Sequence, residues 1–159
     1  PATSFWSGLH WRKRLEQIVQ QPSSADVGKF LAGVVLPAMR EVAVEMQKRG
    51  VQAVVSEESV ADGELRLTIP NPALRDFVYG VRSTRRSVPT FMVRDAASES
   101  TRRHVYEPMT FFEDGRQGYD IQYLRSEEII ADILRHYERY LSLSADQRTQ
   151  LLNRAPGHS

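Results

Sequence analysis

The residue types that usually perform catalysis or bind metals are scattered along this chain. The four histidines fall in four separate predicted elements: His10, His104, His136 and His158. None of them has a second histidine or a carboxylate at the spacing of a metal motif such as H-E-x-x-H. The chain contains no cysteine, no G-x-S-x-G nucleophile elbow and no Gly-rich phosphate loop. We therefore expect no enzymatic activity, no metal and no cofactor.

An excess of arginine between residues 74 and 104 is the most unusual chemical feature of the sequence. Seven arginines are opposed there by three carboxylates, which leaves an excess of four positive charges. Arg82, Arg85 and Arg86 fall on a predicted loop that contains serine and threonine, where guanidinium groups could bind phosphate or lipid headgroups. A solvated loop that is partly paired with neighbouring carboxylates explains the same residues equally well.

A second basic cluster lies near the start of the chain, on a helix predicted for residues 5–20. It combines three consecutive cations with two tryptophans: Trp6, Trp11, Arg12, Lys13 and Arg14. Tryptophan beside lysine and arginine is typical of a membrane–water interface. The alternative is a solvated basic turn with one tryptophan packed in the core. We keep the cluster as a predicted contact with membrane or partner.

The longest predicted helix runs from Ser23 to Gly50. Ser23 and Asp26 have the spacing of a capping box, and Gly50 suits the left-handed residue at which many helices end. Apolar residues recur at helical spacing and give the helix a continuous apolar stripe. Pro37 lacks a backbone donor, so we expect a kink between Gly33 and Pro37. The kink is either a hinge or a static bend around the core.

The middle of the chain alternates polar and apolar residues over short stretches bounded by turn residues, which predicts antiparallel strands. The clearest case is Leu65, Leu67 and Ile69, which alternate with polar neighbours after an Asp–Gly turn. Pro89 and Pro108 should lie at strand starts, bulges or edges, because proline has no amide for the ladder. The predicted strands are 51–57, 64–69, 77–81, 88–93, 104–112 and 118–123.

Two helices are predicted after the last strand. Ser126 caps the first, whose wide apolar stripe must pack against another element. Ser144 and Gln147 have the spacing of a second capping box, which predicts a separate short helix over residues 145–153. The fold class is therefore α+β: two N-terminal helices, an antiparallel meander sheet of about five to six strands, and a C-terminal helix pair packed on the sheet. We divide the chain into a juxtamembrane-type linker helix over residues 1–21, an α+β domain over 22–143, and a short helix with a tail over 144–159.

Composition narrows the function classes. With 159 residues, 41% of them hydrophobic and 26% charged, the chain has the size and composition of one globular domain. A net charge of +1 argues against a nucleic-acid binder held by bulk charge. No apolar run approaches the ~20 residues that span a bilayer, and no signal-peptide pattern opens the chain. Since the first residue is Pro1, we expect a fragment of a longer protein.

Five stretches follow one another in an order shared with a known family: Trp11–Leu15, Phe30–Met46, Asp76–Arg82, Gly118–Ile121 and Ile129–Tyr140. Together they resemble the cytoplasmic C-terminal domain of BetT-type choline transporters, in the betaine/choline/carnitine transporter family. None of the stretches is a catalytic signature, so the resemblance rests on all of them together.

The resemblance implies a non-enzymatic domain that follows the last membrane helix of a secondary transporter, on the cytoplasmic face of the bacterial inner membrane. It implies a regulatory role in which choline or betaine uptake is adjusted to osmotic stress, with the transmembrane domain of the same transporter as partner. The basic clusters add anionic lipid headgroups as candidate partners, through contacts that weaken as salt rises. A homo-oligomer is a further candidate. Two other functions stay open: a small-molecule or nucleotide sensor that uses the loop from Arg82 to Arg86, and a structural oligomerisation domain.

Overall fold

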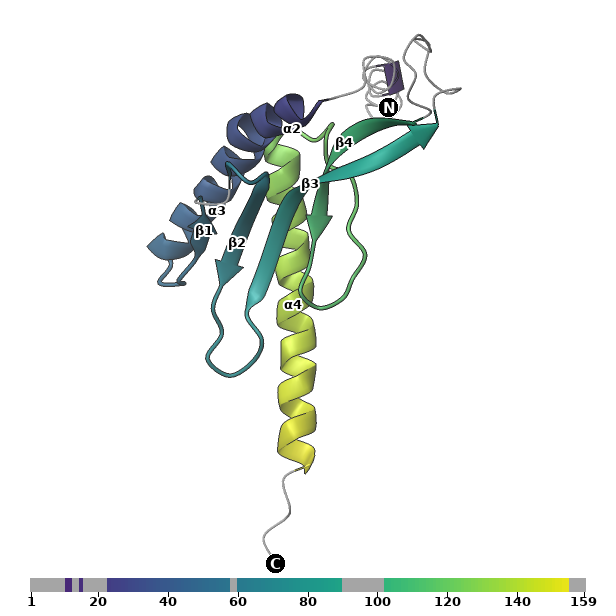
Figure 1. Ribbon diagram of the computed structural model, residues 1–159. Helices are drawn as coiled ribbons and strands as arrows, with labels where there is room; N and C mark the ends of the chain where they lie inside the picture. Colours follow the sequence, from purple (N-terminus) through teal and green to yellow (C-terminus); the bar gives the residue numbers. More distant parts are fainter. Residues whose placement is uncertain (1–10, 13–14, 16–22, 58–59, 90–101, 155–159) are drawn as a thin grey trace, which may run out of the picture.

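The computed structural model describes residues 11–12, 15, 23–57, 60–89 and 102–154 (Figure 1). Within these ranges a four-stranded antiparallel sheet carries helices on one face. The strands lie in the order β1-β2-β3-β4, so each pairs with its neighbour in the chain. The predicted α+β class and antiparallel meander are confirmed.

The predicted long helix is present and has three parts: α2 (Ser24–Phe30), the π-helical turn η1 (Leu31–Val35) and α3 (Leu36–Lys48). The Ser23 hydroxyl accepts a hydrogen bond from the Asp26 amide, and the Asp26 carboxylate accepts one from the Ser23 amide at 2.9 Å. Gly50 follows the helix with a φ of 77°, the left-handed conformation expected at its end. Both end signals are therefore confirmed.

The π-helical turn lies immediately before Pro37. Proline has no amide to donate to the carbonyl of Gly33, and its ring crowds that carbonyl. The turn widens instead, because the Leu36 amide donates to the carbonyl of Leu31, five residues earlier. The structure thus has one wide turn at Leu31–Val35, and the kink expected between Gly33 and Pro37 stays a prediction.

The first predicted hairpin is also confirmed. It consists of β1 (Val54–Ser56) and β2 (Glu64–Ile69), and Val55 lies opposite Leu67. Gly63 occupies the turn with a φ of 75°, which an L-residue with a side chain rarely adopts. The remaining strands are β3 (Phe77–Pro89) and β4 (Arg102–Phe111).

Two features of the predicted sheet are wrong. β3 runs without interruption, so the segment from Arg82 to Arg86 is strand rather than loop and pairs residue by residue with β4. The ladder satisfies the backbone of a segment whose polar side chains are typical of a loop. Residues 118–123 form no strand, because only an isolated bridge between Met109 and Asp120 joins them to β4. The described residues thus contain four strands rather than five or six, and residues 90–93 of one predicted strand lie outside them.

The predicted C-terminal helix pair is a single helix, α4 (Ser126–Arg154). No glycine or proline interrupts this range. Polar side chains near the predicted boundary bond within the helix, since the Ser142 hydroxyl donates to the Glu138 carbonyl at 3.1 Å. The cap motif at Ser144 therefore lies inside a continuous helix, whose second half extends beyond the sheet (Figure 1).

One apolar core lies between the sheet and the helices. Its most deeply buried side chains come from every layer: Leu31, Met39, Leu65, Leu67, Tyr79, Ile121, Ile129 and Ile133. Fully burying a side chain of this size stabilises the fold by about 1.5–3 kcal/mol. Phe77 of β3 extends the core towards the middle of α4, where its ring packs edge-on against Tyr137 at 5.1 Å.

Candidate functional site

The basic N-terminal cluster is described only in part. Trp11 and Arg12 are helical and exposed, and the Arg12 guanidinium lies 5.5 Å from the centre of the Trp11 ring. With 55% of its surface accessible, Trp11 is not packed in the core. Trp6, Lys13 and Arg14 lie outside the described residues. Contact of this cluster with a membrane or partner stays a prediction.

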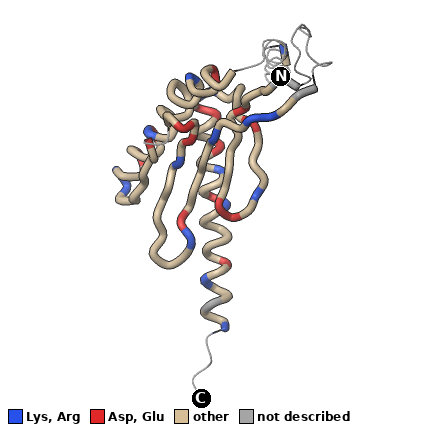
Figure 2. Tube along the Cα trace, viewed as in Figure 1, with Lys and Arg blue, Asp and Glu red and all other residues tan. Residues whose placement is uncertain are grey.

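The three arginines predicted as an anion site do not share one face. Successive residues of a strand point to opposite faces, so Arg85 lies on the face opposite to Arg82 and Arg86. Arg86 pairs with Glu107 at 2.8 Å. Figure 2 shows basic residues spread over several elements of the fold. Anion binding here stays a prediction, but its premise of a shared loop is wrong.

Arg82 is held by an aromatic ring on its own face of the sheet. Its guanidinium lies 3.9 Å from the centre of the Phe111 ring, and that of Arg66 lies 5.1 Å from the same ring. Gly80 lies beneath the ring, where an added Cβ would come within 2.1 Å of it. Such cation–π contacts stabilise by about 0.5–1 kcal/mol each at exposed sites. They orient Arg82 along the sheet.

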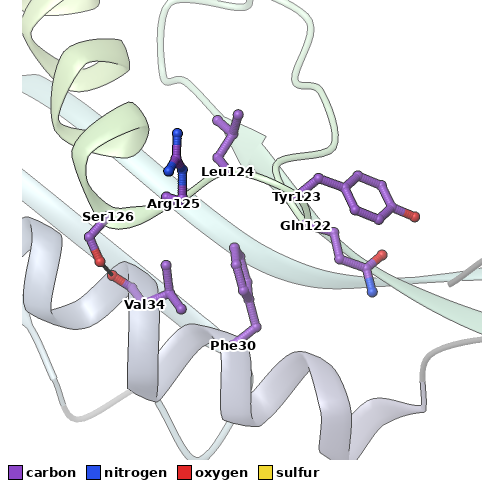
Figure 3. A pocket seen from close by; sticks show the side chains of 7 residues that line it. All are labelled: Phe30, Val34, Gln122, Tyr123, Leu124, Arg125 and Ser126. Carbon is purple, nitrogen blue, oxygen red and sulfur yellow. Dashed lines mark hydrogen bonds between the residues drawn. The ribbon is translucent and has the colours of Figure 1, made fainter. Parts of the chain in front are cut away.

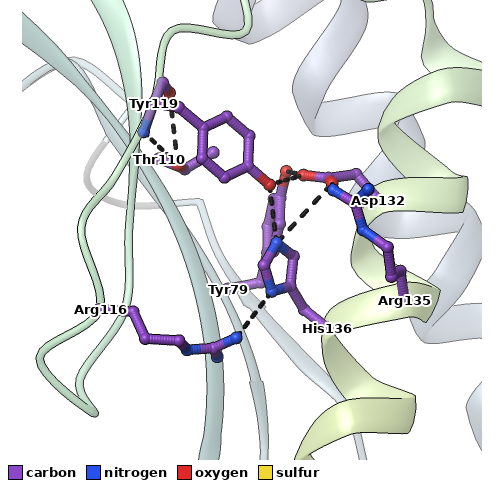
Figure 4. A network of polar contacts seen from close by, with 7 residues as sticks. All are labelled: Tyr79, Thr110, Arg116, Tyr119, Asp132, Arg135 and His136. Carbon is purple, nitrogen blue, oxygen red and sulfur yellow. Dashed lines mark hydrogen bonds and ion pairs between the residues drawn. The ribbon is translucent and has the colours of Figure 1, made fainter.

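The structure brings together a polar network that the sequence did not reveal (Figure 4). Its centre is Asp132 of α4, whose side chain is only 6% exposed. The Tyr79 hydroxyl of β3 donates to this carboxylate at 2.7 Å, and the hydroxyl of Tyr119 and the guanidinium of Arg135 also donate to it. One carboxylate therefore joins the sheet, the loop after β4 and the C-terminal helix.

His136, one turn after Asp132, extends the network. Its Nδ1 lies 2.9 Å from an Arg116 guanidinium nitrogen, and its Nε2 lies 2.7 Å from the Tyr119 hydroxyl. Arginine can only donate, so Nδ1 accepts and the ring proton of neutral His136 is on Nε2. Hydrogen bonds then run in one direction, from Arg116 through His136 and Tyr119 to Asp132.

Burial sets the protonation states of the network. Desolvation raises the pKa values of Tyr79 and Tyr119, and the negative charge of Asp132 raises them further. Both phenols therefore remain donors. Desolvation lowers the pKa of His136, Asp132 opposes this shift, and the positive charge of Arg116 adds to it. His136 is consequently neutral near pH 7.

The arrangement acts chemically as a clamp rather than a reactive centre. Asp132 already accepts hydrogen bonds from three donors. The raised pKa values of the two phenols keep them protonated near pH 7, so neither can accept a proton as a general base. Within the described ranges, no group of three His, Asp or Glu side chains could hold a metal ion. The network instead ties α4 to the sheet through charge-assisted hydrogen bonds.

Only one part of this clamp, the pair Asp132 and His136, is local in the sequence. Asp132 and His136 are spaced by four residues, which places them close together on one side of a helix, and Asp132 interrupts an apolar stretch. Their partners Tyr79 and Tyr119 are 40 positions apart from each other in the chain. Only the tertiary fold brings these residues to one point. All four fall in stretches that carry the family resemblance.

A cavity of about 350 Å³ opens between the helical segments α2 and η1 on one side and the loop before α4 on the other (Figure 3). Its lining residues are Phe30, Val34, Gln122, Tyr123, Leu124, Arg125 and Ser126. The Ser126 hydroxyl donates to the Val34 carbonyl at 3.4 Å and joins the two walls. In Figure 3 the Arg125 side chain points away from Phe30. The guanidinium and the aromatic ring therefore do not face a common position that a ligand could occupy.

One further property of the described chain concerns membranes. Among its helices, none combines the length and the apolar character that crossing a bilayer requires. The apolar stretch Leu31–Met39 and the long helix α4 both fall short of these requirements.

Comparison with known proteins identifies relatives, although no protein-family model matches the chain. An uncharacterized transporter from Haemophilus influenzae is 39% identical over 158 residues, covering 96% of this chain and 23% of that protein. A high-affinity choline transport protein from Escherichia coli K12 is 34% identical over 155 residues, covering 95% and 22%. The osmo-dependent choline transporter BetT2 from Acinetobacter baylyi is 31% identical over 138 residues, covering 84% and 20%.

The chain thus spans about a fifth of the length of these curated relatives. The similarity is not confined to one motif, since it extends over most or nearly all of the present sequence in each case. The chain is therefore homologous to one segment of bacterial choline transporters, which confirms its resemblance to that family.

Proposed function

We propose that this chain is the C-terminal regulatory domain of a choline or betaine transporter, on the cytoplasmic face of the inner membrane. In this role it adjusts uptake to osmotic stress and takes no part in catalysis. The observation that carries the proposal is the homology with choline transporters, one of them named as osmo-dependent, over nearly the whole chain but only about a fifth of their length. The α+β unit with its own core suits a domain attached to the transport unit.

Salt-sensitive contacts with lipid or with the transport unit are the mechanism we propose. Trp11 and Arg12 are exposed, and each basic residue near an anionic leaflet contributes about 1 kcal/mol of attraction. Arg85 and Arg86 are exposed as well, on the part of β3 that pairs with β4 but not with β2. The Debye length is about 8 Å at physiological ionic strength and becomes shorter as salt is added, so a rise in salt weakens such contacts.

A hinge at Gly33 and Pro37 is the second part of the proposal. The π-helical turn η1 sits between the N-terminal part of the chain and the sheet, and its Val34 lines the cavity together with Phe30 of α2. A turn that already departs from α-helical hydrogen bonding can change shape at lower cost than a regular one. Motion at this turn would transmit a change in membrane contact to the clamped core.

The lipid contact is tested by binding this chain to vesicles of anionic phospholipid across a salt series. A variant with glutamine at Arg12, Lys13 and Arg14 removes three charges from the cluster, and a control variant removes three charges at Lys48, Arg49 and Arg139. We expect roughly 100-fold weaker binding for the first variant and little change for the control, since three charges contribute about 3 kcal/mol. Absence of binding at low salt, or equal loss in both variants, would contradict the lipid contact.

A further inference from the structure

The outer surface of the helical layer contains a groove between α3 and α4. Its volume is about 370 Å³, and its floor is apolar, with Val42 and Met46 on one side and Ile130 and Leu134 on the other. Leu134 is 48% exposed, so the described residues leave this apolar floor accessible to solvent. The rim residues are Glu41, Glu45 and Arg49.

The same apolar line continues along α4 beyond the sheet. At 100° per residue, Leu134, Leu141 and Leu152 project within about 20° of one another. Leu141 is 48% exposed and Leu152 is 77% exposed. The second half of α4 extends beyond the sheet (Figure 1), and an isolated helix of about 14 residues is marginal in water. The second half of α4 therefore needs a surface to pack against.

We propose that a second copy of this chain provides that surface, in a two-fold pair of antiparallel α4 helices. With Leu141 of both copies on the two-fold axis, Leu152 of one copy comes opposite Ile130 of the other. The exposed leucine thereby fills the open groove of its neighbour, and the same contact repeats on the other side of the axis. Such a self-complementary surface is what a two-fold interface requires.

Charge complementarity favours this occupant. Arg148 follows Ile130 by 18 residues, which is five full turns, so it projects from α4 on the side that faces α3. In the pair it comes opposite Leu134 of the other copy, next to Glu41 on the groove rim; the other rim carboxylate, Glu45, is already paired with Lys48 and Arg49. Among the described residues, neither Arg148 nor Glu41 has an ion-pair partner. In the two-fold pair, Arg148 of each copy would form an ion pair with Glu41 of the other copy.

The association state of this chain tests the proposal, measured by sedimentation equilibrium up to roughly 300 μM. We expect a reversible monomer–dimer equilibrium with a Kd in the micromolar range, of roughly 1–100 μM. Leu141→Glu should raise the Kd at least about 100-fold, because two carboxylates would meet on the axis in place of two buried leucines. Circular dichroism would check that each variant remains folded.

Two sets of control variants distinguish this interface from non-specific hydrophobic association. Leu143 is 47% exposed on the opposite side of the same helix, so Leu143→Glu should leave the Kd unchanged. Arg148→Glu and Glu41→Arg should each raise the Kd roughly 3–10-fold, and the double variant should recover most of the loss. A chain that stays monomeric, that forms trimers, or that responds equally to Leu141→Glu and Leu143→Glu would overturn the proposal.

Discussion

The charged residues of this molecule occupy two regions that differ in burial. In the clamp, Asp132 is buried and accepts from Tyr79, Tyr119 and Arg135. On the outer part of β3, Arg86 pairs with Glu107, whose side chain is 20% exposed against 6% for Asp132. Both arginines are largely exposed, Arg135 at 71% and Arg86 at 64%, so the difference lies in the carboxylates and in the two phenols that Asp132 also binds. Buried charges are screened much less by salt than exposed ones. The buried contacts of Asp132 with the two phenols should therefore depend little on ionic strength, whereas the contacts of exposed arginines should weaken as salt rises.

The difference matters for a domain proposed to respond to osmotic stress. If all charges were exposed, a rise in salt would weaken the fold and its contacts together. With Asp132 enclosed between α4 and the sheet, the core can stay intact while the outer contacts change. The predictions that follow test whether the two regions are separate in this way.

Asp132→Asn should have the largest effect. It removes the buried charge on which two phenols and Arg135 converge, and breaking such a site costs about 3–5 kcal/mol of unfolding free energy. Denaturant unfolding measures the loss, which should persist in high salt. Glu127→Gln, an exposed change in the first turn of the same helix, should cost less than about 1 kcal/mol. Equal effects of the two substitutions would remove the distinction between the regions.

Gly118→Ala should have the next largest effect. An added Cβ would lie 1.7 Å from the Thr110 carbonyl oxygen, so the backbone must shift and carry the neighbouring Tyr119 away from Asp132. We expect a loss of about 2–3 kcal/mol in unfolding free energy. Gly33→Ala is the control, because nothing lies within 4 Å of its added Cβ. That helical change should stabilise the fold by up to about 1 kcal/mol, and destabilisation there instead would show that space is not the deciding factor.

The pH dependence of stability should report His136. Its pKa is lowered in the fold, so the unfolded chain binds the proton more readily. Unfolding free energy must therefore decrease as the pH falls below the unfolded value of about 6.5, until the folded pKa is passed. Compared with the parent, His136→Gln should flatten this dependence, whereas His104→Gln, an exposed change on β4, should not. A parent whose stability rises as the pH falls through this window would contradict the neutral His136.

Arg86→Gln should have the smallest effect on stability. The ion pair with Glu107 is largely exposed at the arginine, and such pairs contribute less than about 1 kcal/mol. The difference between parent and variant should approach zero in about 1 M salt, where the Debye length is about 3 Å. A large, salt-resistant loss would place Arg86 with the buried charges and blur the comparison.

The parts of the fold that depend on local signals could be predicted from the sequence. The capping box at Ser23 and the stop at Gly50 each follow from one or two residues and their immediate neighbours. The hairpin of β1 and β2 likewise follows from strict alternation and a glycine turn.

The parts of the fold that depend on residues far apart in the chain could not be predicted from the sequence. The Ser/Thr/Arg segment from Arg82 to Arg86 has the composition of a loop and becomes strand because β4 supplies a ladder for it. The motif at Ser144 could start a helix, but α4 begins at Ser126 and no glycine or proline ends it before Ser144. The clamp around Asp132 required the contact of a strand, a loop and a helix, which no short pattern records.

The central claim is tested most directly by uptake measurements on a full-length transporter that carries this domain. A version truncated before Pro22 would be compared with the intact protein, with and without osmotic upshift, at matched membrane levels. The account predicts that the truncated transporter still takes up substrate but no longer changes its rate on upshift. A truncated transporter that responds to upshift as the intact one does would contradict the regulatory role.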